Sequence, residues 1–215
     1  ILGVMLMLTV LSALEMSCGG TNATSMRLVK TEGTVEVADG QGSAVPIKEK
    51  LGLYSGYQVE TDKESYAWID LDEVKLAKMD EDSEIEIQKS EDKKKLEIDV
   101  RSGGLFFNVT EPLGEDESME IRTSTMITGI RGTCGWMERG EDYSRLGLLE
   151  GTVECRTPKG DSVAVEAGQM AVLADGETQI QVRPLSREDV PDFVLEEAGE
   201  LTAGLPAGTD EESGP

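Results

Sequence analysis

The stretch Thr-Glu-Gly-Thr-Val-Glu-Val at residues 31–37 returns late in the chain as Leu-Glu-Gly-Thr-Val-Glu-Cys at residues 149–155. In both copies a glycine opens a run in which apolar and polar residues alternate, the period of two that is typical of a strand with one buried face. A second glycine follows each copy, at Gly40 and Gly160. The two units bracket the middle of the chain, so they predict one β domain rather than two.

Further short runs between the two units alternate in the same way, at residues 66–71, 84–87 and 96–100. Turn-forming residues separate these runs, and no helical period of useful length occurs before residue 185. The pattern predicts an all-β fold. It leaves two architectures open, a short-stranded sandwich and a solenoid-like β roll.

The pattern changes after Pro184. Residues 186–189 resemble a capping box, and the apolar residues that follow predict one short C-terminal helix within 184–199. From residue 200 the composition turns to glycine, alanine, proline, threonine and acids, which predicts an acidic disordered tail at 200–215. The β domain is then expected at 27–183.

An ordered series of motifs runs from about Val29 to Leu173. Its members are GTVEV at 33–37, L-x-x-G-x-x-V-x-T at 53–61, SYAWIDL at 65–71, DSEIEI at 82–87, L-x-I-x-V-x-x-G-x-L-F-x-x-V at 96–109, GIRGT at 129–133, GTV at 151–153 and AGQMA at 167–171. The series resembles the FecR domain family, an extracytoplasmic β domain. The best-known members carry this domain behind a cytoplasmic sigma-regulating segment and a transmembrane helix, whereas only a signal-like run precedes it here. The resemblance therefore implies a lipoprotein-type member without the cytoplasmic segment.

Residues 1–14 form an apolar run without one charge, too short to span a bilayer alone. The run predicts a signal peptide over 1–17, N-terminally incomplete because the chain begins with Ile1. Ser17, Cys18 and two glycines resemble a lipoprotein cleavage site, so we expect a lipid on Cys18 and a tether at 18–26. The expected location is the extracytoplasmic face of a membrane. An ordinary signal peptide, giving a secreted protein, and a truncated membrane anchor are the alternatives.

The chain has 43 acidic and 20 basic residues and a net charge of -23. Such a charge repels phosphate backbones, so nucleic acid is not an expected partner. The sequence contains no histidine, which excludes Ser-His-Asp and Cys-His catalysis and every imidazole metal site. We therefore expect neither an enzyme nor a cofactor nor a metal.

Two cysteines remain after Cys18, and each is expected on a strand beside a Gly-Thr turn. In an exported protein Cys134 and Cys155 could form a disulfide. Cys155 takes the place of Val37 in the repeated unit, so a buried free thiol is an equal alternative.

Two further groups of residues are candidate contact sites. Gly129, Arg131 and Gly132 predict a structural turn with a buried arginine that bridges neighbouring strands, and an exposed partner contact is the second interpretation of Arg131. Tyr66 and Trp68 share one strand face, which could bind a peptide or a sugar or could be covered by the C-terminal helix.

These observations favour a non-catalytic FecR-domain lipoprotein that binds or senses an envelope or surface protein. The alternative is a surface module that binds cell wall or polysaccharide through Tyr66 and Trp68, so a glycan is the second expected partner. The membrane would be engaged only through the lipid.

Overall fold

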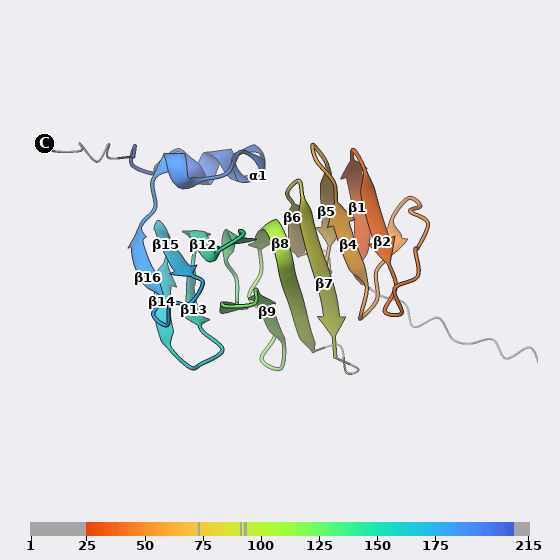
Figure 1. The fold of residues 1–215 in the computed structure, drawn as a ribbon, viewed down its shortest axis with the longest axis horizontal. Coiled ribbons are helices and arrows are strands. Elements are labelled where there is room, and N and C mark those ends of the chain that lie inside the picture. Colours follow the sequence, from red (N-terminus) through yellow and green to blue (C-terminus); the bar gives the residue numbers. More distant parts are fainter. Residues whose placement is uncertain (1–24, 73, 91, 93, 209–215) are drawn as a thin grey trace, which may run out of the picture.

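The computed structural model describes residues 25–72, 74–90, 92 and 94–208. Within these residues, sixteen strands form two sheets that share one long strand, β8 (Lys95–Val109) (Figure 1). Sheet A contains, in spatial order, β3 (Leu51–Gly52), β1 (Arg27–Glu32), β5 (Tyr66–Asp70), β6 (Lys75–Met79), the second half of β8, β11 (Cys134–Arg139), β12 (Tyr143–Glu150), β15 (Gln169–Ala174) and β16 (Gln181–Pro184). Sheet B contains β2 (Val35–Ala38), β4 (Gln58–Thr61), β7 (Ser83–Lys89), the first half of β8, β9 (Ser118–Arg122), β10 (Ile127–Ile130), β13 (Thr152–Arg156) and β14 (Ser162–Glu166).

Strand β8 passes from one sheet to the other at a pair of glycines. Its first half pairs with β7 and β9, and its second half pairs with β6 and β11. Gly103 has a φ of 73°, and a side chain there would collide with Ser83. Glycine is the residue that adopts this backbone without steric cost, so the crossing point depends on it.

The main core lies between the two sheets and follows from the alternation in the sequence. Ala67 and Ile69 of β5 enter this core from sheet A, and Ile85 and Ile87 of β7 enter it from sheet B. The glutamates of β7 point away from it. The all-β prediction with one short helix near the C-terminus is confirmed, and the sheets are open.

The two repeated units open β2 and β13, which lie toward opposite ends of sheet B. Their glycines, Gly33 and Gly151, have φ values of 73° and 89°. Both units therefore use a left-handed glycine to start a strand of the same sheet.

A second, smaller core lies on the outer face of sheet A, beneath α1 (Asp192–Thr202). Figure 1 shows this helix at the top of the view, across the strands of sheet A. The helix begins later and ends later than the expected 184–199. Strand β16 runs to Pro184, and the capping box of Ser186 and Asp189 starts a 3-10 turn, η1 (Arg187–Asp189), ahead of it.

Part of the expected tail lies on the domain. The Arg187 N–H donates to the Pro206 carbonyl at 2.9 Å, so the chain returns to the domain after α1. Residues 209–215 of the tail, the signal peptide and Cys18 lie outside the described residues. Within residues 25–208 as described, no helix is long and apolar enough to cross a bilayer.

Candidate interaction surfaces

One row of directly paired residues crosses the outer face of sheet A beneath α1. Its members, from β1 to β15, are Lys30, Trp68, Lys78, Phe106, Trp136, Gly147 and Met170. Trp136 is fully buried, and its indole occupies the space that a side chain at Gly147 would need. Its apolar members Phe106, Trp136 and Met170 pack with the buried residues of the helix.

Lys78 is a fully buried cation in the middle of this row. Its Nζ donates to Glu196 Oε2 at 2.6 Å and to the Phe193 carbonyl at 3.2 Å, and it lies 3.4 Å from Glu197 Oε1. All three partners belong to α1. A buried ammonium must be paired, so Lys78 ties the helix to sheet A.

On the aromatic face, Trp68 is covered and Tyr66 is half-buried. Trp68 is 9% exposed, and its Nε1 donates to Glu197 Oε1 at 2.9 Å. Lys30 Nζ lies 3.8 Å from the centre of the Trp68 ring. Of the two interpretations of this face, coverage by the C-terminal helix is what the structure shows for Trp68.

Arg131 is exposed, so the prediction of a buried bridging arginine is wrong. Thr128 and Ile130 of β10 point inward, and the alternation of the strand then places Gly129 and Arg131 on the outside. Gly132, with a φ of 70°, forms the turn into β11. The turn itself is as expected, but the arginine does not hold the strands together.

Cys134 and Cys155 are both free and buried, so the disulfide alternative is wrong. They lie in different cores: Cys134 faces the helix side of sheet A, and Cys155 lies between the sheets beside the other inward residues of sheet B. Burial raises the pKa of Cys134 to about 12 and that of Cys155 to about 11. Both thiols therefore stay protonated and unreactive at neutral pH.

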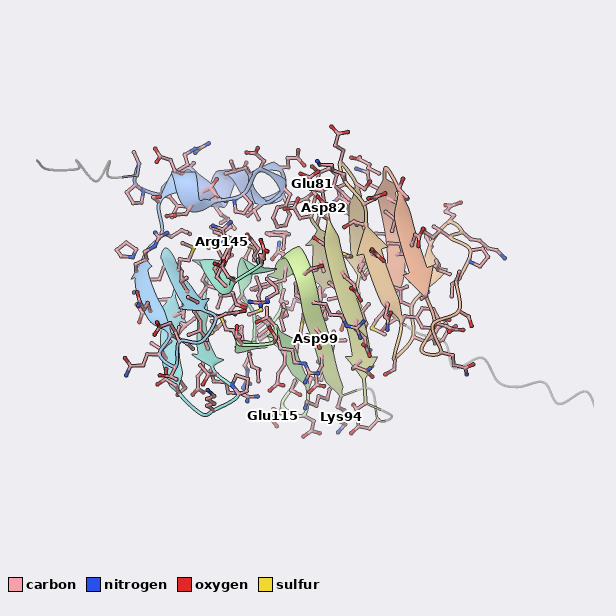
Figure 2. The ribbon with its side chains drawn as sticks, in the orientation of Figure 1. Glu81, Asp82, Lys94, Asp99, Glu115 and Arg145 are labelled. Carbon is pink, nitrogen blue, oxygen red and sulfur yellow. The ribbon has the colours of Figure 1, made fainter. Side chains whose placement is uncertain are left out.

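The β6–β7 turn lies beside α1 and is rich in carboxylates. Figure 2 shows Glu81 and Asp82 in this turn. Burial raises the pKa of their neighbour Asp80 to about 6, although the hydrogen bond that its Oδ1 accepts from the Glu81 N–H at 2.9 Å lowers it. Among the described residues no group of three or more ligand side chains could hold a metal ion.

The end of sheet B at β2 is hollowed on its surface. A groove of about 460 Å³ lies between β2 and the loop that follows it, and its apolar lining includes Val35, Val45 and Ile47. Ile47 is 39% exposed. Three glutamates on neighbouring strands, Glu36, Glu60 and Glu84, also line it.

The comparisons with known proteins agree with this fold. Residues 57–154 match the family model described as "FecR protein", which covers β4 to most of β13. Two crystal structures described as "a putative anti-sigma factor from Parabacteroides distasonis ATCC 8503" are similar with a TM-score of 0.53 and 11% identity. The alignment covers 60% of this chain and 59% of those chains. No curated protein sequence matches the chain.

Proposed function

Because residues 57–154 match the FecR family model, we propose that this chain is a non-catalytic regulatory or sensing protein that acts by binding another protein at the cell envelope. The FecR match is the observation that carries the proposal. The solved structures of similar fold bear an anti-sigma description, and this description supports a regulatory role here.

The partner is proposed to be a protein rather than a glycan. The glycan alternative needed Tyr66 and Trp68 as an open platform, and Trp68 lies under α1. The open edges of the sheets, by contrast, suit a protein segment that adds a strand.

Crosslinking in the native host, followed by mass spectrometry of what is bound to the full chain, tests this proposal. We expect one protein to be recovered reproducibly with the wild type. Recovery of no specific protein, together with saturable binding of the purified chain to peptidoglycan or to a glycan array, would contradict the proposal and favour polysaccharide binding instead.

We also propose that the chain is exported and held at the membrane by a lipid on Cys18. The support is the sequence around Cys18 and the apolar run before it. A buried acyl chain contributes about 0.8 kcal/mol per CH₂. Cys18→Ser should lose metabolic palmitate labelling and leave the membrane fraction, and labelling that persists in this variant would contradict the assignment.

A further inference from the structure

We propose that the edge of β2 binds an extended basic segment of the partner protein, which pairs with Val35 as an added strand of sheet B. The inference rests on the proposed protein-binding function and names the place and the chemistry of the contact. β2 lies outside the residues that match the FecR family, so the proposed contact does not follow from the family match.

The outer edge of β2 is only half covered by its own loop. The Val37 carbonyl accepts a hydrogen bond from the Val45 N–H at 2.7 Å, and Ala38 pairs with Ala44. Pro46 follows at once, lacks an N–H and ends this pairing.

The neighbouring part of the edge is open. Because backbone groups two residues apart point to the same side of a strand, the N–H and C=O of Val35 face outward beside the Val37 carbonyl. No other described segment pairs with this side of Val35. An added strand could therefore hydrogen-bond to the N–H and the C=O of Val35, just beyond the part of the edge that the loop covers.

The groove beside this edge has an apolar floor. Val35 and Val45 are partly buried against the main core, and Ile47 remains exposed. In an added strand every second side chain would point toward these residues. The inward positions of the partner segment should therefore be valine or isoleucine.

The outward positions of the partner segment should be basic, because the strands beside them carry a row of glutamates. Glu36 of β2 is paired directly with Glu60 of β4, and Glu60 with Glu84 of β7. Like charges opposite one another destabilise a sheet. At one end of this row Arg101 donates to Glu84 at 2.7 Å and to Glu86.

The other end of the row has no cation. In the described part of the chain, neither Glu36 nor Glu60 forms an ion pair, and Glu36 is the outermost member. A lysine or arginine on an added strand, opposite Glu36, would form an ion pair with Glu36, as Arg101 does with Glu84. A second copy of this chain fits less well, because its β2 would bring another Glu36 to the same place.

The test uses a short capped peptide in which valine and lysine alternate, and the full chain as its receptor. We expect saturable binding that weakens by about tenfold when glutamate replaces lysine in the peptide. Glu36→Lys and Glu60→Lys should each weaken binding by a similar factor. Glu154→Lys, the same change at another exposed glutamate, on β13 of the same sheet, should leave binding unchanged. A peptide with methylated backbone amides should not bind, because it cannot donate to the edge.

Melting temperatures equal to wild type show that the charge variants are folded. Equal binding by Glu36→Lys, Glu60→Lys and Glu154→Lys would overturn the inference, as would equal binding of the methylated peptide, which would show adsorption to an acidic surface only. A dimer in light scattering that Glu36→Lys strengthens would assign the edge to a second copy instead. If the crosslinked partner of the wild type is still recovered with Glu36→Lys, the edge assignment fails while the protein-binding function stands.

Discussion

At the scale of single residues, Lys78 is a buried cation beneath α1, and Asp80, in the turn beside it, is a half-buried carboxyl. Lys78 has no exposed surface, and its partners are Glu196, Glu197 and the Phe193 carbonyl. Taking an ammonium out of water costs several kcal/mol unless it is paired. The helix must therefore be docked for Lys78 to be stable where it lies.

Lys78→Ala should lower the free energy of unfolding by about 2 kcal/mol, because it removes the ion pairs and leaves space beneath the helix. Chemical denaturation measures this loss. Lys30→Ala is the matched control, since Lys30 contacts the same Trp68 ring but its side chain is 54% exposed, and it should cost less than about 1 kcal/mol. Equal effects of the two substitutions would show that burial of Lys78 does not matter.

Asp80 gives a prediction about pH. Its pKa in the folded protein, about 6, lies above the usual value of 3.8, so the folded state binds the proton more tightly than the unfolded state does. Its contribution to stability is then full below about pH 4 and is lost as the pH rises through about 6.

Asp80→Asn keeps the acceptor for the Glu81 N–H and cannot ionise. Melting temperatures of wild type and variant should therefore separate as the pH rises from about 4 to about 7, with the variant the more stable at neutral pH. A constant difference across this range would show that Asp80 titrates as an exposed carboxyl.

The sequence predicts only in part which of the charged residues are buried. Alternation in 84–87 and 96–100 places the glutamates outward and the isoleucines inward, because a sheet with one core has only two faces. The same rule, applied to 128–131, would have placed Arg131 outside. Lys78 could not be recognised as buried, since its covering residue Glu196 lies 118 positions later in the chain.

At the scale of elements, the helix and the long strand decide the shape of the outer core. Phe193 of α1 lies against Gly104 of β8, where a side chain would come within 2.9 Å of its ring. Gly104 thus lets the helix approach the strand closely. Such a contact depends on one glycine in a strand and one aromatic residue in a helix, and neither is visible from local periodicity.

Phe193→Ala should cost about 3 kcal/mol of unfolding free energy, the usual loss for a buried phenylalanine. Leu201→Ala, on the exposed side of the same helix at 42% exposure, should cost little. Denaturant titrations of the two variants decide whether α1 is held by its buried face. Similar losses would mean that helix propensity, not docking, sets the stability.

At the scale of the whole molecule, the repeated units predicted one β domain, and they do start strands toward the two ends of a single sheet. The choice between a sandwich and a roll was not available from the sequence. It depends on where β8 changes sheet, and thus on a bend at Gly103 rather than on any repeat. Because α1 covers Trp68, the sheet edges and the acidic outer face of sheet B are better candidates for a partner contact than this aromatic residue.

Site-specific photocrosslinking in the native host tests whether this chain acts by binding a protein. A photoreactive residue is placed in turn at the exposed positions Glu36, Glu154 and Leu201 of the full chain. We expect a discrete protein adduct from position 36 and none from position 154. Absence of a protein adduct from all three positions, under conditions where the chain is produced and folded, would contradict the proposed protein binding.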